Sequence, residues 1–181
     1  MVTDNCGCRF ERLKTLEDSR SIRFPKPDAS VVVRGREAEV VGSPTASVKL
    51  LADSSTTGGA LSTVLVSLEE GADGARPHRH EPAAEMFFVL AGVVRVLSGK
   101  EIVRAQRGDV IVVPPHLPHA FSAERGSRAQ ILIVIAPGVE YFRKITRIAR
   151  GQEPPESLRD VQEVYDTYFL SSPEWEAAQK E

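Results

Sequence analysis

Cysteine is nearly absent from this chain of 181 residues, which has only Cys6 and Cys8. A disulfide between residues two apart would close a strained ring, and two cysteines cannot build a disulfide framework. We therefore interpret the pair as reduced thiols near the N-terminus, with ligation of a soft metal as the alternative.

Long hydrophobic runs and an excess of one charge are lacking too. The longest strongly apolar run is ILIVIA at 131–136, far below the roughly 18 residues that span a bilayer. The start, MVTDNCGCRFERLK, has no apolar middle of a secretory signal, so we expect a cytoplasmic protein. A net charge of -2 and a pI of about 6.1 give no reason to expect a nucleic-acid or membrane partner.

Strand-like segments fill the centre of the sequence, from about residue 45 to 136. Each has four to eight residues, is rich in Val, Ile and Phe, and is bounded by Gly, Asp or Pro, as strands are. We expect hairpin turns at Gly92, at Ser98-Gly99 and at 107–109, and a turn at TTGGA, 56–60. No intervening segment is long enough for a crossover helix, so an antiparallel sandwich or barrel is predicted.

The flanking segments have different patterns. FPKPDAS and VVGSPTAS in the first 44 residues indicate an extended arm with turns, and SVVVRGREAEVV (30–41) indicates one or two short strands. After residue 137, apolar residues recur at helical spacing over 141–149 and again over 158–169. We therefore expect three parts: an arm with short strands over 1–44, a barrel over 45–137, and helices over 138–181 that pack on the barrel or on a partner subunit.

Histidine is also rare, and two of the four histidines lie in PHRHEPAAE, residues 77–85. Side chains alternate along a strand, so His78 and His80 would point the same way. After a short turn, Glu85 starts the segment EMFFVL and can face the same interior. His119 follows a proline-rich bend in GDVIVVPPHLPHAF and could join them. Three imidazoles and one carboxylate suit one divalent iron, manganese, nickel, cobalt, copper or zinc ion.

The spacing of these residues resembles that of the cupins, which are small antiparallel β-barrels of the double-stranded β-helix or jelly-roll type. The first cupin motif, H-x-H, three or four residues, E, six residues, G, is matched by His78, His80, Glu85 and Gly92. The second motif is matched by Gly108, Pro114 and His119. It departs from the family at His116, where a glycine is usual, and at Ala123, where asparagine is usual; Ala72 also replaces a glycine before the first motif. The resemblance covers about residues 45 to 137 and implies a metal at His78, His80, Glu85 and His119.

Period two also predicts the surroundings of the metal. If Glu85 and His119 face inward, so do Phe87, Val89 and Phe121, as a pocket wall for a hydrophobic or aromatic substrate or as ordinary barrel filling. Arg76 could meet a substrate anion or be an exposed arginine on the rim, and His116 could shuttle protons or be a solvated loop residue.

No phosphate-binding loop, dinucleotide fingerprint or G-x-S-x-G motif is present. The resemblance is strongest to the quercetin-dioxygenase-like single-domain cupins. It implies a metal-dependent dioxygenase of a small aromatic or enediol-like molecule, with Glu85 as both ligand and catalytic proton acceptor, and a homodimer. A Lewis-acid cyclase or isomerase of secondary metabolism and a non-catalytic small-molecule binder are the alternatives. Substrate, native metal and use of dioxygen stay open.

Overall fold

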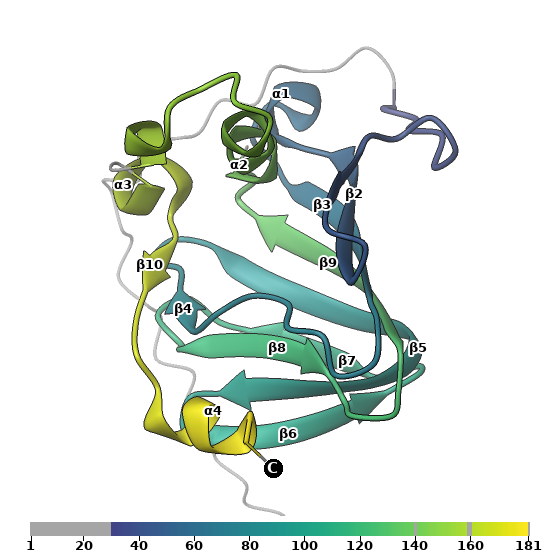
Figure 1. Ribbon diagram of the computed structural model, residues 1–181. Coiled ribbons are helices and arrows are strands. Elements are labelled where there is room, and N and C mark those ends of the chain that lie inside the picture. The colour runs from purple at the N-terminus through teal and green to yellow at the C-terminus, as the bar shows by residue number, and fades with distance from the viewer. Residues whose placement is uncertain (1–29, 140, 159–160, 181) are drawn as a thin grey trace, which may run out of the picture.

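The computed structural model describes residues 30–139, 141–158 and 161–180. Most of the expected N-terminal arm, with Cys6 and Cys8, lies outside these residues. Within them, the all-β prediction is confirmed: ten strands form one antiparallel sheet that curls on itself. Figure 1 shows β2, β3 and β9 on one side of the curled sheet and β6 and β8 on the other.

One half of the sheet has the order β1-β2-β3-β9-β5-β7, and the other has β6-β5-β8-β4-β10. The strands, in chain order, are β1 (Val40–Gly42), β2 (Ala46–Ala52), β3 (Ser62–Leu68), β4 (His78–Arg79), β5 (Ala84–Ser98), β6 (Glu101–Gln106), β7 (Val110–Val113), β8 (His119–Ala123), β9 (Ala129–Ala136) and β10 (Tyr168–Phe169).

The two halves share β5, and the hairpin turn expected at Gly92 is wrong. β5 continues through this residue, which has φ 74° and bends the strand from one half to the other. A Cβ here would lie 1.7 Å from the carbonyl oxygen of Arg128, so the bend requires glycine. The turns expected at Ser98-Gly99 and 107–109 are present.

Alternation along the strands decides which side chains fill the barrel. On β3 and β9 every second residue is buried, and these residues form the core with those of β5. The apolar buried members of this set are Val64, Val66, Leu68, Phe87, Val89, Val94, Val96, Ala129, Ile131, Ile133 and Ile135. Burying such side chains against one another is the main contribution to the stability of a small barrel.

Two expectations for the N-terminal side are met in part. The segment SVVV (30–33) forms no strand, and β1 is the one short strand of 30–44. The first two residues of TTGGA (56–60) end a one-turn helix, α1 (Ser54–Thr57), which the Asp53 side chain caps and Gly58 ends with φ 64°. The rest of the segment is the expected turn before β3. A helix of one turn has no periodicity to detect, and only its cap residues mark it.

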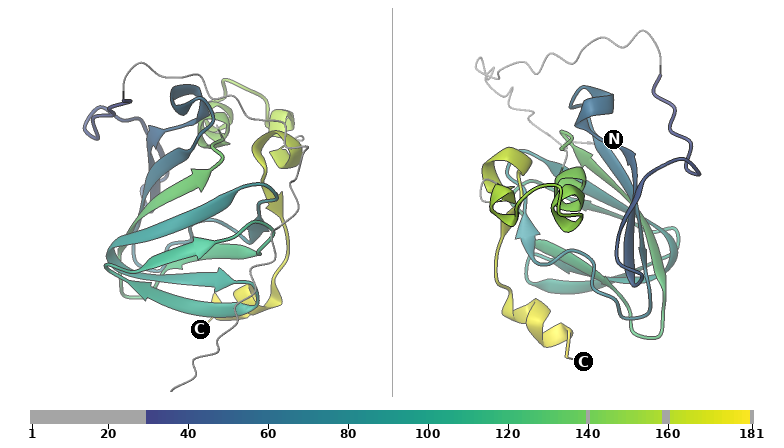
Figure 2. Two further views of the ribbon diagram at one scale, coloured as in Figure 1. Left: turned by 180° about the vertical axis from the view of Figure 1, so that it is seen from behind. Right: turned by 45° about the horizontal axis from the view of Figure 1, so that its top comes forward.

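The C-terminal part is more irregular than two helical stripes. Helix α2 (Tyr141–Ala149) forms as predicted and lies across the open end of the barrel (Figure 2, right). It is followed by the 3-10 helix η1 (Pro155–Leu158) and by α3 (Val161–Tyr165). The helical prediction over 158–169 is wrong at Tyr168 and Phe169, because these residues form β10 and pair with β4.

A final helix, α4 (Pro173–Ala178), lies within the part expected to be helical, although no apolar spacing marked it. Its Trp175 is buried against Leu97, Ala120 and Ile102 on the outside of the sheet. The carbonyl of Ala178 and the side chain of Gln179 accept hydrogen bonds from the buried guanidinium of Arg95. The chain from β10 to α4 therefore runs down one side of the barrel as a strap, which Figure 1 shows in yellow.

Candidate metal centre

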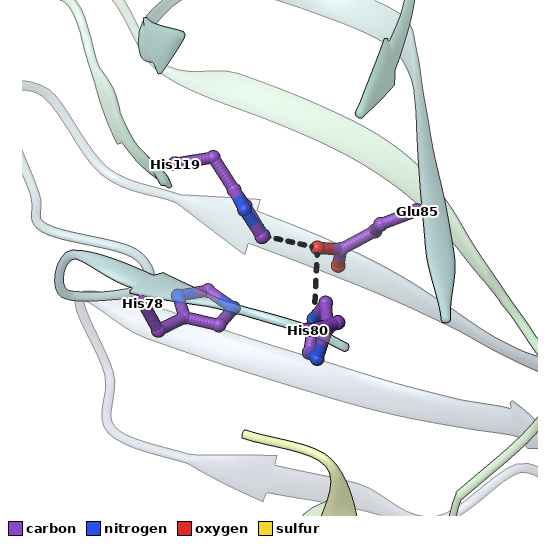
Figure 3. A group of neighbouring side chains, drawn as sticks. All are labelled: His78, His80, Glu85 and His119. Atoms are coloured by element: carbon purple, nitrogen blue, oxygen red, sulfur yellow. Dashed lines mark hydrogen bonds and ion pairs between the residues drawn. The ribbon is translucent and has the colours of Figure 1, made fainter. Parts of the chain in front are cut away.

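Four side chains from three strands meet inside the barrel. His78 lies on β4, and His80 is the first residue after that strand. Glu85 is the second residue of β5, and His119 starts β8, where it pairs with His78. One nitrogen or oxygen of each lies within 4.8 Å of the others, and all four residues are buried. Figure 3 shows the carboxylate between His119 and His80, with His78 at the side of the group.

Each histidine is oriented by a hydrogen bond from its Nδ1 to a backbone carbonyl. His78 Nδ1 lies 2.8 Å from the oxygen of Arg76, His119 Nδ1 lies 2.9 Å from that of Leu117, and His80 Nδ1 contacts that of Asp166. A carbonyl only accepts, so each Nδ1 carries the proton and each Nε2 presents a lone pair. Histidines that bind metals usually donate their other ring N–H to a carbonyl or carboxylate in this way.

Glu85 brings negative charge to these lone pairs. Its Oε2 lies 2.7 Å from His119 Nε2 and 3.5 Å from His80 Nε2, and His80 Nε2 has no hydrogen-bond partner among the described residues. A carboxylate and neutral Nε2 atoms are all acceptors, so close approach is favourable only with a proton or a metal cation between them. A divalent metal ion fits this donor set.

The pKa shifts agree with a site for a cation. Burial lowers the pKa of the His78 imidazole to about 4, so it is neutral at physiological pH. Burial alone would raise the pKa of Glu85, but His119 and His80 beside it outweigh that effect and hold it well below its usual range. Burial likewise lowers the pKa of His80, but the neighbouring Glu85 carboxylate more than reverses this shift.

A residue just before the C-terminal strap, Asp166, completes the site, and sequence reasoning missed it. Asp166, buried and with φ 50°, gives its carbonyl to His80. Its carboxylate accepts hydrogen bonds from the backbone N–H groups of Glu81, at 2.7 Å, and Ala83, at 3.0 Å. The loop between the second histidine and the glutamate is therefore held by a residue 86 positions after His80.

A cavity of about 420 Å³ opens onto the site. His78, His80 and Glu85 line one end, and most of the wall is aliphatic or aromatic, from β1, β2, β3, β9 and α2. Such a volume lies within the range of about 300 to 1,000 Å³ of small-molecule sites. The residues that sequence reasoning missed include the helix residues Tyr141, Phe142 and Ile145, whose helical stripe indicated only packing.

The pocket residues expected from the sequence divide into two groups. Arg76 and Phe121 line the cavity. Phe87 and Val89 are buried in the core and are not part of the cavity wall, although the Phe87 ring lies 5.3 Å from that of Phe121 and 6.2 Å from that of His119. His116 is exposed, away from the cavity wall.

His116 has a structural role through its backbone. Its N–H donates to the carbonyl of His80 at 2.6 Å, and its φ of 69° is the left-handed conformation that the usual glycine adopts easily. Histidine is among the residues that tolerate this region. The departure from the motif therefore leaves the turn before His119 intact.

Comparisons with known proteins agree with this geometry. A family model described as the Cupin domain matches residues 64–135. KdgF from Halomonas sp. has a similar structure, with a TM-score of 0.55 and 23% identity over 63% of this chain and 99% of that one. An RmlC-like cupin from Shewanella frigidimarina gives 0.53 and 19%, over 63% and 96%.

A predicted oxalate decarboxylase from Thermotoga maritima gives a TM-score of 0.53 and 20% identity, over 59% of this chain and 99% of that one. A search of the curated proteins finds no match. None of the described helices is long and apolar enough to cross a membrane. With the motif residues gathered inside a barrel of the expected topology, residues 64–135 match the cupin domain in sequence, and the fold around them is that of the cupins.

Proposed function

We propose that the protein is a metal-dependent cupin enzyme that acts on a small, largely apolar organic molecule, and that its reaction is a dioxygenation. The observation that supports the proposal most is the opening of an apolar cavity directly onto three of the four clustered side chains, His78, His80 and Glu85. A molecule in this cavity would lie beside the donor atoms.

The three imidazoles and one carboxylate determine which chemistry the site could supply. Four protein ligands leave two positions of a six-coordinate ion for other molecules. When bound, a divalent transition metal would supply a Lewis acid and, if it is redox-active, the electrons that dioxygen chemistry needs. The apolar wall would exclude water from the reacting groups.

Glu85 is the residue that we propose as proton acceptor as well as ligand. It is buried, and its pKa lies well below the usual range because His119 and His80 offset the effect of burial. It is therefore a carboxylate at neutral pH. Its Oε2 atom contacts His119, and a substrate hydroxyl in the cavity could transfer its proton to the carboxylate.

A Lewis-acid isomerase or cyclase is the second candidate, and two cavity residues favour it. Arg76 and Tyr141 both line the cavity, where a guanidinium and a phenol can stabilise an oxyanion without electron transfer. The same four ligands also suit zinc, which has no redox chemistry. A protein that binds a small molecule in this cavity without converting it is the third candidate.

The metal decides between these candidates. We would purify untagged protein without chelators or a nickel column, measure its metal content by elemental mass spectrometry, and follow oxygen consumption with flavonols and other enediol-like aromatics. About one iron, manganese, nickel, copper or cobalt ion per chain, with substrate-dependent oxygen consumption, supports the dioxygenase. Zinc with no oxygen consumption supports the Lewis-acid enzyme, and no metal after reconstitution contradicts both.

A further inference from the structure

Arg76, just before β4, and Arg79, on β4, each lie on an aromatic ring of β10 but differ in their charged partners. The guanidinium of Arg79 lies 5.5 Å from the ring centre of Tyr168 and pairs with Glu81 at 3.1 Å. That of Arg76 lies 4.9 Å from the ring centre of Phe169. Within the described residues, no carboxylate lies at ion-pair distance from Arg76.

The position of Arg76 makes this difference meaningful. Arg76 is exposed and also lines the cavity, so its side chain lies where the cavity meets solvent. A guanidinium that lies on an aromatic ring keeps the N–H groups at its edge available, and two of them match the two oxygens of a carboxylate. Arg79, in contrast, does not line the cavity.

Tyr141, the first residue of α2, lines the same cavity. Burial raises the pKa of its phenol, although the charge of Arg76 lowers it in part. The phenol is therefore protonated at neutral pH and can donate a hydrogen bond. Because Arg76 and Tyr141 line the same cavity, an oxyanion bound between them can contact both.

The other hydroxyls of the cavity wall already have acceptors. Thr146 donates to the carbonyl of Phe142 at 2.8 Å, and Thr167 donates to that of Tyr165 at 2.9 Å. The rest of the wall away from the metal site is apolar. A ligand that fits must therefore have an apolar body and one anionic group, because a dianion such as phosphate would find only one cationic side chain in this wall.

We propose that the cavity binds an apolar monocarboxylate, with its carboxylate held by Arg76 and Tyr141 and its body against the aliphatic wall. This inference deepens the proposed function by naming the class of substrate, and it rests on that function only in calling the ligand a substrate. The carboxylate is held by protein groups and not by the metal, so its recognition persists in metal-free protein.

Three probes of one shape test this proposal by isothermal titration calorimetry: 2-naphthoate, 2-naphthalenemethanol and 2-naphthylmethylamine. Each is measured with metal-loaded and with chelator-treated protein. We expect 2-naphthoate to bind at least about ten-fold more tightly than the alcohol in both forms, since a hydrogen bond to a charged group contributes about 1.5 to 3 kcal/mol. The amine should bind most weakly.

Four variants identify the groups responsible. Arg76→Met should weaken 2-naphthoate by about ten-fold or more and the alcohol by less than about two-fold. Arg76→Lys should retain part of the preference, and Tyr141→Phe should lose about three-fold or more of the 2-naphthoate affinity. Arg79→Met is the matched control and should change neither ligand. A normal circular dichroism spectrum establishes that each variant is folded.

Equal binding of acid and alcohol would overturn the proposal, as would a preference for the amine. So would an acid preference that is unaffected by Arg76→Met and vanishes when the metal is removed, because the carboxylate would then be a metal ligand. If 2-naphthoate shows the expected pattern but the metal and oxygen assays fail, the carboxylate site stands and the proposed enzyme function does not. If the metal and oxygen assays succeed without an acid preference, only the assignment of substrate class is wrong.

Discussion

The Nε2 atom of His119 lies 2.7 Å from the Oε2 atom of Glu85, while its Nδ1 donates to the carbonyl of Leu117. The proton that a neutral His119 carries is thus committed to the backbone, and the carboxylate faces a lone pair. Because both groups are buried, solvent cannot offset the repulsion. Either a proton on Nε2 or a bound metal cation removes this repulsion, so the pair favours positive charge between its two atoms.

Removal of one imidazole should therefore remove the metal. His80→Ala should lower the bound metal from about one ion per chain to below about a tenth, because only three ligands remain. The barrel should stay folded, since the His80 ring lies within the site and not in the apolar core. Elemental mass spectrometry and circular dichroism measure the two outcomes.

The matched control is His116→Asn, which changes an exposed histidine and keeps a residue that tolerates positive φ. Its metal content should equal that of the wild type. Full metal occupancy in His80→Ala would contradict the ligand assignment, and a similar loss in both variants would point to a general effect on the loop instead of ligation.

Asp166 should stabilise both the fold and the metal. In Asp166→Ala, the N–H groups of Glu81 and Ala83 lose their acceptor, and alanine must adopt a φ of 50°. We expect a loss of about 2 to 4 kcal/mol in the free energy of unfolding by urea. Because His80 also loses a fixed carbonyl, metal affinity should fall by about 10- to 100-fold.

Asp166→Asn keeps one acceptor oxygen and a residue suited to positive φ, so its losses should be smaller. Glu163→Ala, an exposed change on α3, should have no effect on either quantity. Unchanged metal affinity in Asp166→Ala, measured by competition with a chelator, would show that the strap covers the site without positioning His80.

Sequence patterns predicted the parts of this structure that depend on local periodicity. Alternation predicted that Phe87 and Val89 face inward with Glu85, and the H-x-H spacing placed His78 and His80 together on one side of a strand. The spacing from Glu85 to Gly92 matched a family motif, although the glycine bends a strand and does not end it. These inferences required only the geometry of a strand.

The strap could not be predicted in this way, because its contacts join residues far apart in the chain. Tyr168 and Phe169 continue an apolar helical stripe in the sequence, yet they pair with Arg79 and His78 in the structure. Asp166 gives no local signal, since an aspartate before a threonine is as typical of a turn as of a metal site. Pairing with β4 therefore decides the structure of this segment against its helical pattern. The residues just before it hold His80 through the carbonyl of Asp166.

Asp53 should make α2 sensitive to acid. Its carboxylate caps α1 and accepts a hydrogen bond from Arg143 of α2 at 2.5 Å. Burial alone would raise the pKa of Asp53, but the bonds from Ser55 and Arg143 outweigh it, so the pKa lies below the ordinary value of 3.8. Asp53→Ala should cost about 0.5 to 2 kcal/mol at pH 7 through loss of the cap.

The sign of the pH effect follows from the lowered pKa. The ionised carboxylate stabilises the folded state at every pH above 3.8, and this stabilisation is lost as the pH falls through the folded-state pKa. The stability difference between wild type and Asp53→Asn, which keeps a capping side chain, should thus be constant from pH 7 to about 5 and shrink below about 4. A difference that grows on acidification, in urea titrations at each pH, would contradict the assignment.

The exposed edge of the sheet predicts a homodimer. Val110 and Val112 of β7 are 54% and 65% exposed. They pair across the sheet with Phe88 and Met86, which are only half-buried, so four apolar side chains share one outer face. Within the described residues β7 pairs only with β5, which leaves an unpaired strand edge beside this face.

We therefore expect a dimer in sedimentation velocity at micromolar concentration, and Val112→Glu should shift it to a monomer because a charge in an apolar contact is costly. Val164→Glu places the same charge on α3, where the valine is 62% exposed, and should leave the dimer unchanged. Metal content should be equal in all three proteins, because Val112 lies outside the metal cluster. A wild-type monomer, or a dimer that survives Val112→Glu, would show that this face is not the interface between subunits.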